Sequence, residues 1–366
     1  MKREFYLQLA ASGLRMPIGT DLVLHEQPDP EAVKLDGEAL GRVVEAAAAR
    51  YGTPLAFPLM DLKLEKADLL RLLGAPDAGV DGFHFGAPPP EEDIERVRSA
   101  AQREFAPRNR AHIDSVRYIA ERTPLMPVGM AIGPFSLMTK LMADPITAVA
   151  MAGAGATAEA EPLVLLAERT LALAECAVQR SVQAQIRAGA KAMLICEPAA
   201  NRVYISPKQV GSGAGVFEQF VMQPNLRLRR LLEDAGVDLI FHDCGELTAE
   251  MVQQFGVRLR PVILSLGSSR RLWEDAAVIP RDVVLFGNLP TKNFYSDAAL
   301  PLEKVGEMAA ELTARMRQAG HPHILGSECD VLHVPEAAAT IRKKVDRILV
   351  PGAGLEPARP LRDKGF

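Results

Sequence analysis

Three side chains that bind transition metals follow two apolar runs of this sequence. His242 and Cys244 lie two residues apart directly after "VDLIF", and Cys329 lies in "ILGSECDV", after another apolar run. In an extended segment residues i and i+2 face the same side, so His242 and Cys244 can reach one ion while Asp243 turns away. An imidazole with two thiolates suits Zn²⁺, and three protein ligands leave a fourth position open, as in a catalytic zinc site.

A His-x-Cys pair alone is weak evidence for a metal, because a cysteine is often a small buried hydrophobe. The further cysteine at the end of another strand strengthens the interpretation. Two other cysteines serve as a contrast. Cys176 lies inside the long helical stretch "LLAERTLALAECAVQRSVQAQIRAGA", where we expect it in the core. Cys196 ends an apolar run and could lie in the core or at the rim, so it is left out of the metal set.

Short apolar runs alternate with amphipathic stretches, which is the pattern of parallel strands with helical crossovers. The runs are apolar throughout, as in strands buried on both faces. We expect strands over 54–60, 124–130, 191–196, 237–241, 261–266, 282–287 and 323–326, with 80–85 as a possible short element. Helices are expected over 93–104, 162–189, 217–235, 247–255, 302–319 and 335–349.

This alternation predicts an α/β fold, a (β/α)8 TIM barrel with an N-terminal helical extension over residues 1–50. An open doubly wound sheet is the rival, but "GSGAG" at 211–215 does not join a strand to a helix with the glycine spacing of a dinucleotide site. We expect one domain over 1–352 and a loose tail over 353–366, which is rich in Gly, Pro and charge.

Composition excludes several classes of protein. The formal net charge of −4 gives no basic footprint for nucleic acid, and no apolar run reaches the roughly 18 residues of a membrane helix. The start of the chain is interpreted as mature protein and not as a signal peptide. Four cysteines in 366 residues do not form a disulfide scaffold, so we expect a cytoplasmic protein with reduced thiols.

In a barrel, chemistry sits at the carboxyl ends of the strands. His242 and Cys244 follow one strand and Cys329 another, while Glu197 follows the run 191–196 and Asn288 the run 282–287. The sequence therefore predicts a functional site at this rim. His84 could line the mouth or merely a loop, and His321 and His323, at a strand start, are interpreted as structural.

The stretches "IFHDCGE", "DVVLFGNLP" and "GHPHILGSECDVLHVPEAA" resemble the C-terminal half of the uroporphyrinogen decarboxylase superfamily. The resemblance covers about residues 50 to 350 and includes "TPLMPVGMAIGPFSLMTKLM" and "AGAKAMLICEPAANRVYISPKQV". True decarboxylases of the superfamily have an Arg- and Gly-rich N-terminal stretch that grips a tetrapyrrole. Only Arg15 hints at it here.

The other branch, the cobalamin-dependent methyltransferases such as methylcobalamin:coenzyme M methyltransferases, carries His-x-Cys and a later Cys as a zinc site. His242, Cys244 and Cys329 match that motif position by position, and "PLMDLKLEKADLLRLLGA" resembles its Asp-x-x-x-Glu segment. In that branch a carboxylate on the strand after His-x-Cys can be a fourth, exchangeable ligand. The matching stretch here, "RPVILSLGSSRR", offers Ser265 and Ser268 but no acid.

The resemblance implies a methyltransferase with Zn²⁺ held by His242, Cys244 and Cys329. Glu197, Glu328, water or substrate would fill the fourth position. Cobalamin would come on a corrinoid carrier protein, since the chain has no D-x-H-x-x-G motif, and a small molecule would donate or accept the methyl group, in either direction.

Two further side chains are assigned catalytic roles. Glu197 would orient substrate or balance charge, although it could instead only cap the following helix. Asn288 would hydrogen-bond substrate, although it could be a turn residue. Two alternatives remain open for the whole chain: a metal-free tetrapyrrole decarboxylase, and a non-catalytic corrinoid- or metal-binding accessory protein.

Overall fold

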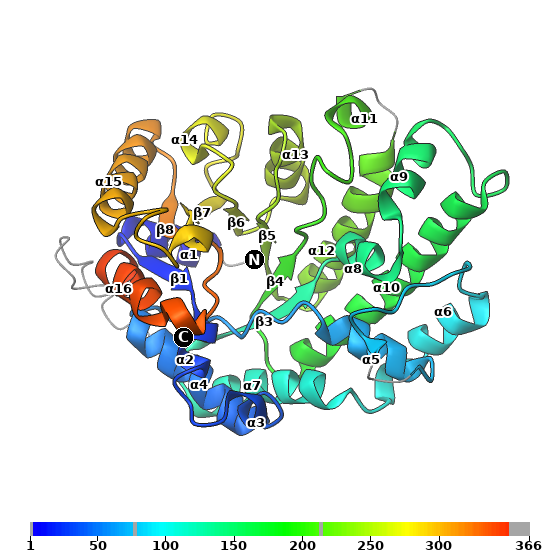
Figure 1. The fold of residues 1–366 in the computed structure, drawn as a ribbon, viewed down its shortest axis with the longest axis horizontal. Helices are drawn as coiled ribbons and strands as arrows, with labels where there is room; N and C mark the ends of the chain where they lie inside the picture. Colours follow the sequence, from blue (N-terminus) through cyan, green and yellow to red (C-terminus); the bar gives the residue numbers. More distant parts are fainter. Residues whose placement is uncertain (1–2, 76–78, 212–214, 351–366) are drawn as a thin grey trace.

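The computed structural model describes residues 3–75, 79–211 and 215–350. Among these, eight parallel strands form one sheet in the order β1-β8-β7-β6-β5-β4-β3-β2, curled inside a ring of helices (Figure 1). The predicted α/β fold of (β/α)8 type is confirmed. The strands are β1 (Arg15–Ile18), β2 (Leu55–Ala56), β3 (Met126–Ile132), β4 (Ala192–Cys196), β5 (Asp238–Asp243), β6 (Ile263–Leu266), β7 (Val284–Leu289) and β8 (His323–Asp330).

Helices alternate with these strands along the chain. They are α1 (Arg3–Ala11), α2 (Thr20–Leu24), α3 (Pro30–Val33), α4 (Gly37–Tyr51), α5 (Leu64–Leu72), α6 (Glu91–Arg98), α7 (Pro107–Arg122), α8 (Pro134–Leu141), α9 (Pro145–Gly153), α10 (Pro162–Arg187), α11 (Pro207–Gly211), α12 (Gln223–Asp234), α13 (Ala249–Gln253), α14 (Leu272–Asp275), α15 (Leu302–Ala319) and α16 (Ala338–Leu349). Short 3-10 turns lie at 100–102, 291–293 and 335–337, and π-helical turns at 218–222 and 254–259. None of the described helices is long and apolar enough to span a membrane.

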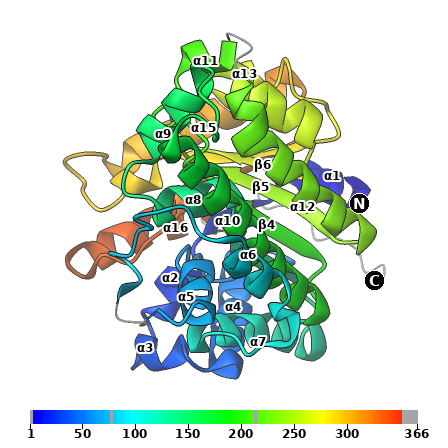
Figure 2. The same ribbon diagram turned by 90° about the vertical axis from the view of Figure 1, so that its right-hand side faces the viewer.

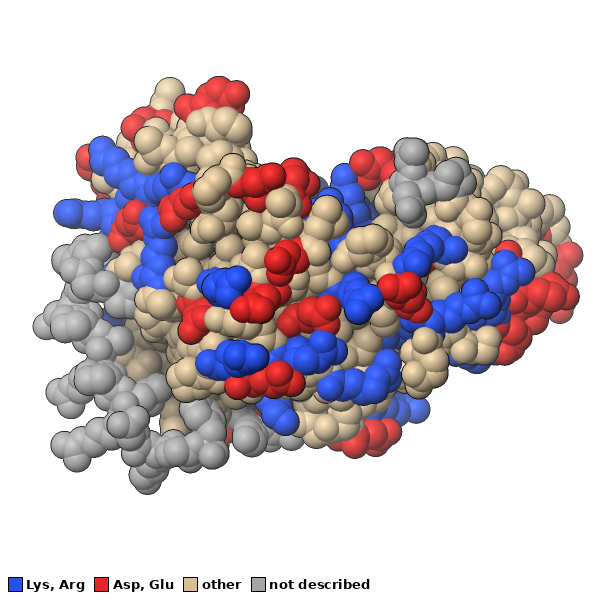
Figure 3. Space-filling view, turned by 90° about the horizontal axis from the view of Figure 1, so that it is seen from below, with Lys and Arg blue, Asp and Glu red and all other residues tan. Residues whose placement is uncertain are grey.

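The strands form the core because both of their faces are covered. Every residue of β3, β4, β5, β6 and β7 is buried, which explains why these strands are apolar runs with little alternation. Helix α10 packs against β3, and helix α12 packs against β5. Figure 2 shows α10 and α12 on the outer side of the sheet, beside β4 and β5. On the face seen in Figure 3, acidic and basic side chains are interspersed, in line with the small net charge.

The first 50 residues are helical as predicted, except for β1, which the sequence analysis missed. Arg15 and Met16 pair with Leu325 and Gly326 of β8, so this segment supplies a barrel strand and is more than a helical extension. A four-residue strand with an arginine and a proline carries too little apolar pattern to be recognised. The predicted boundary at 352 and the tail 353–366 lie outside the described residues.

Other elements differ from the expectation. Residues 80–85 form no strand but a loop whose Phe85 N–H donates to the Leu141 carbonyl at 2.9 Å. Helix α7 was not predicted because its exposed face carries many charged residues, "PRNRAHIDSVRYIAER". Helices α10, α15 and α16 begin and end close to the predicted bounds.

Candidate metal centre

The structure brings His242, Cys244 and Cys329 together at the carboxyl ends of two strands. His242 lies at the end of β5, Cys244 follows it, and Cys329 lies near the end of β8. One ring nitrogen and the two sulfurs all lie within 4.8 Å of one another. The convergence that the sequence predicted is therefore present in the fold, and binding of a metal by these residues stays a prediction.

One ring nitrogen of His242 has a hydrogen-bond partner, and the other has none among the described residues. His242 is 1% exposed, and its Nδ1 lies 2.8 Å from Ser265 Oγ of the neighbouring strand β6. Its Nε2 is buried and has no hydrogen-bond partner among the described residues. A buried polar atom without a partner is uncommon, and a metal-ligating histidine commonly uses its second nitrogen for an orienting hydrogen bond. The arrangement of His242 fits that of a metal ligand.

The sulfur positions also fit a tetrahedral ion. With Zn–S bonds of about 2.3 Å, two sulfurs on one tetrahedral zinc lie about 3.8 Å apart. The donor atoms of the cluster lie within 4.8 Å of one another, so a shift of about an ångström would close the set around an ion. The donor set of one imidazole and two thiols is compatible with zinc.

The pKa values of the two neighbouring thiols shift in opposite directions. The thiol of Cys329 donates to Cys244 and, with His242 and Lys292 nearby, lowers the pKa of Cys244 despite its burial. The same hydrogen bond, with burial, raises the pKa of Cys329. Burial lowers the pKa of Lys292, but the neighbouring Cys244 and Cys329 raise it by more. A metal bound here would displace the thiol protons, because thiolates are the ligating form.

Lys292 was missed by the sequence analysis. It lies in the 3-10 turn 291–293, directly after β7, in "FGNLPTKN". The only sequence pattern that could have found it is a lysine a few residues beyond a strand end, and many lysines share that position.

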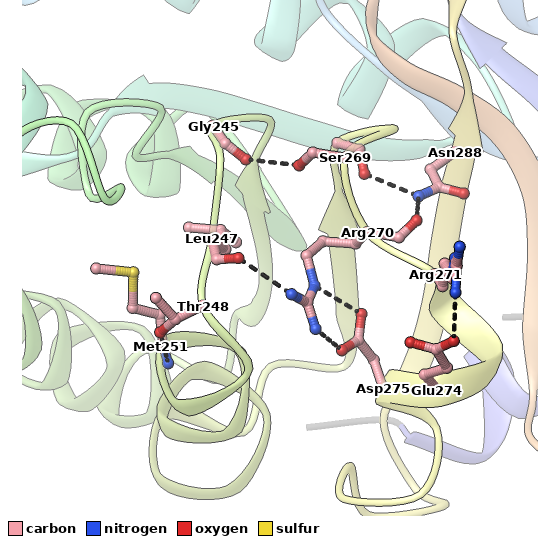
Figure 4. A network of polar contacts seen from close by, with 11 residues as sticks. Gly245, Leu247, Thr248, Met251, Ser269, Arg270, Arg271, Glu274, Asp275 and Asn288 are labelled. Atoms are coloured by element: carbon pink, nitrogen blue, oxygen red, sulfur yellow. Dashed lines mark hydrogen bonds and ion pairs between the residues drawn. The ribbon is translucent and has the colours of Figure 1, made fainter. Parts of the chain in front are cut away.

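Loops after three strands hold the backbone around Cys244. A Cβ on Gly267 would lie 2.6 Å from the Cys244 carbonyl oxygen, so a glycine is needed where the two loops touch. The amide of Asn288 donates to the carbonyls of Gly267 at 2.8 Å and Arg270 at 2.9 Å. Arg270 in turn donates to the Leu247 carbonyl at 3.0 Å and forms a partly buried ion pair with Asp275 (Figure 4). Asn288 thus links the end of β7 to the loop after β6.

Glu197 is fully buried and its oxygens accept hydrogen bonds from the start of α8 and from α12. The donors are Phe135 N at 3.1 Å, Ser136 N at 2.8 Å and Asn225 Nδ2 at 2.9 Å. Burial raises the pKa of Glu197, and these donors oppose the rise. The contacts are those of a carboxylate that caps a helix, but this helix is α8, which precedes β4, and not the following helix of the alternative interpretation. The catalytic roles of Glu197 and Asn288 stay predictions.

The other acids near the cluster do not join it. Glu328 accepts from Ser268 Oγ at 2.6 Å and from Lys292 N at 3.3 Å. Asp243 accepts from Gly245 N at 2.8 Å through one oxygen, and its other oxygen is buried without a described partner. Asp330, next to Cys329, has both oxygens buried without a described partner. The fourth ligand position is therefore not assigned to any of them.

Neither of the other two cysteines belongs to the cluster. Cys196 is fully buried in β4, and Cys176 is half-buried on α10 against the core. The ring nitrogens of His321 and His323 lie 2.9 Å and 2.8 Å from the carbonyls of Val283 and Gly287. Both histidines thus hydrogen-bond the backbone at the neighbouring strand β7, which agrees with their interpretation as structural residues.

Comparison with known proteins gives a family and a fold. The model of the uroporphyrinogen decarboxylase (URO-D) family matches residues 80–345. No curated protein sequence is similar enough to be matched with this chain. Among solved structures, a methyltransferase from Methanosarcina mazei is similar, with 18% sequence identity and a TM-score of 0.64 over 94% of this chain and 98% of that one. At this identity the likeness concerns the fold.

Proposed function

The chain belongs to the uroporphyrinogen decarboxylase (URO-D) family, and from that premise we propose that it is a zinc-dependent methyltransferase. It would move a methyl group between a corrinoid on a carrier protein and a thiol or another small acceptor or donor. The observation that carries the proposal is the cluster of His242, Cys244 and Cys329, with its vacant histidine nitrogen. A solved structure of the same fold that is described as a methyltransferase supports it.

Several residues of this chain would hold the ion or support its ligands. His242, Cys244 and Cys329 would hold the ion, and Ser265 would keep the imidazole turned toward it. A zinc ion bound there would lower the pKa of a substrate thiol, so that a thiolate is present at neutral pH. Lys292 adds a positive charge beside the anionic sulfurs. Glu197 would support the site by holding the start of α8, and Asn288 would support it by holding the loop after β6.

A corrinoid on the carrier protein would supply the methyl group without its bonding electron pair, and the thiolate held by this chain would provide the electron pair of the new sulfur–carbon bond. The transfer would therefore need no other oxidant or reductant. In the opposite direction a methylated amine, ether or thioether would lose its methyl group to the corrinoid.

A second candidate function is a metal-free tetrapyrrole decarboxylase, which the family's name favours. That reaction has no use for an imidazole with two thiols within 4.8 Å at the barrel mouth. A non-catalytic accessory protein would keep the metal and transfer no methyl group to any thiol.

The experiment that tests the proposal is metal analysis of the protein purified under reducing conditions. We expect one zinc per chain in the wild type and in Cys176→Ser, and loss of that zinc in Cys244→Ser and in Cys329→Ser. Demethylation of methylcobalamin with a panel of thiols then tests the chemistry. A wild type without stoichiometric zinc refutes the proposal, and a zinc-loaded protein that is inactive in both directions favours the accessory role.

A further inference from the structure

A second candidate site lies away from the metal cluster, on the side of β2 and β3. It is a cavity of about 150 Å³ lined by Leu62, Lys63, Lys66, Val80, Asp81, His84 and Lys140. Leu62 and Lys63 follow the carboxyl end of β2, Lys66 lies in the first turn of α5, and Lys140 lies in the last turn of α8. None of these residues belongs to the elements that carry His242, Cys244 or Cys329.

Lys66 is a buried cation without a carboxylate partner among the described residues. It is 4% exposed, and its Nζ donates to the carbonyls of Phe83 at 2.8 Å and of Lys140 at 2.7 Å. An ammonium group has three N–H donors, so these contacts leave one for a ligand. Burial lowers the pKa of Lys66 and the Lys140 ammonium lowers it further, while the Asp81 carboxylate opposes this shift. A buried charge without a directly bonded counter-ion is costly, and an anion in the cavity would reduce that cost.

The charge of the cavity wall is positive overall. Three lysines and one aspartate give a formal charge of +3 − 1 = +2. The aspartate, Asp81, pairs with Lys63 at 2.9 Å, while Lys140 is exposed and has no ion pair among the described residues. His84, exposed on the loop 79–86, adds an imidazole to the same wall.

We propose that this cavity binds a dianionic phosphate group of a small phosphorylated ligand. A charge of +2 matches a phosphate dianion better than a carboxylate. The volume is below the roughly 300 Å³ of sites that enclose a drug-sized ligand, so the cavity suits one anionic group and not a whole molecule. This inference does not depend on the metal centre and would stand if the proposed methyl transfer failed.

The test is calorimetric titration of the full chain at constant ionic strength with inorganic phosphate, methyl phosphate, dimethyl phosphate and acetate. We expect one site per chain for the first two, and at least about tenfold weaker binding of the two monoanions, since a second charge adds a charge-assisted contact. Inorganic phosphate and methyl phosphate distinguish a free-phosphate site from a phosphate-ester site.

Variants then locate the binding. Lys140→Met, on an exposed position, should weaken phosphate binding by about tenfold to a hundredfold, as the loss of a hydrogen bond to a charged group predicts. Lys66→Met should do the same, with circular dichroism to check its folding. Lys304→Met, an exposed lysine that pairs with Glu307 elsewhere, is the matched control and should bind like the wild type. Absence of saturable phosphate binding, acetate bound as tightly as phosphate, or a Lys140→Met variant with unchanged affinity would overturn the inference.

Discussion

Replacement of Ser265 by alanine should weaken zinc binding without removing a ligand. The serine hydroxyl lies 2.8 Å from His242 Nδ1, and both residues are 1% exposed, so water cannot take its place. When Nε2 binds an ion, Nδ1 carries the proton and donates to this hydroxyl. A buried hydrogen bond to a group that shares the metal's charge contributes about 1.5–3 kcal/mol. The zinc affinity of Ser265→Ala should therefore fall about tenfold to a hundredfold, the range typical of such orienting partners.

The assay is competition for zinc with a chromophoric chelator at fixed pH. Ser268→Ala is a matched control, because the same substitution three residues on removes a hydroxyl that contacts Glu328 and not His242. Ser265→Thr keeps the hydroxyl and should recover most of the affinity. The reasoning is refuted if Ser265→Ala binds zinc as tightly as the wild type, or if Ser268→Ala loses as much affinity.

Two further predictions concern a buried acid and a glycine. Burial raises the pKa of Glu65 from 4.5 to about 7, so the folded state holds a proton that the unfolded state releases, and stability declines as the pH rises from about 4.5 to about 7. Glu65→Gln should remove this decline, which amounts to up to about 3 kcal/mol in the free energy of unfolding. Urea unfolding across this pH range measures it, and parallel curves of stability against pH for the wild type and the variant would contradict the prediction. Gly267→Ala places a methyl group against the Cys244 backbone, so it should lower the free energy of unfolding by about 1–3 kcal/mol and weaken zinc binding. Gly82 has open space around it, so Gly82→Ala should change neither stability nor zinc affinity. Thermal unfolding measures the stability, and chelator competition measures the zinc affinity.

The barrel was predictable from the sequence because its strands are buried on both faces. Apolar runs such as 191–196 and 237–241 are short and separated by amphipathic helices, and β4 and β5 lie at those positions. β1 was not predictable, because its four residues include Arg15 and Pro17 and its pairing with β8 joins residues about 310 positions apart. Only tertiary context makes such a segment a strand.

The candidate site was predictable in part for a related reason. His242, Cys244 and Cys329 each follow an apolar run, and the barrel topology turns that shared position into proximity. The same rule selected Glu197 and Asn288, but it says nothing about where a side chain points. Both of these side chains contact backbone groups of neighbouring loops or helices. The role of Ser265 depends on the β5–β6 register, which pairs it with His242 and which the sequence does not reveal.

Position 265, beside His242, carries a hydroxyl and no carboxylate, and this affects the net charge of the metal centre. Fold membership does not choose between reactions, so the choice depends on the side chains at the strand ends. One imidazole and two thiolates balance the two charges of a zinc ion, and a hydroxyl in place of a carboxylate beside His242 adds none. A substrate thiolate in the fourth position would then be the first surplus negative charge among the ligands of the ion, near the Lys292 ammonium. Lys292→Met should therefore raise the KM for an anionic thiol more than it lowers the zinc content, and equal loss of both would show that Lys292 only supports the cluster.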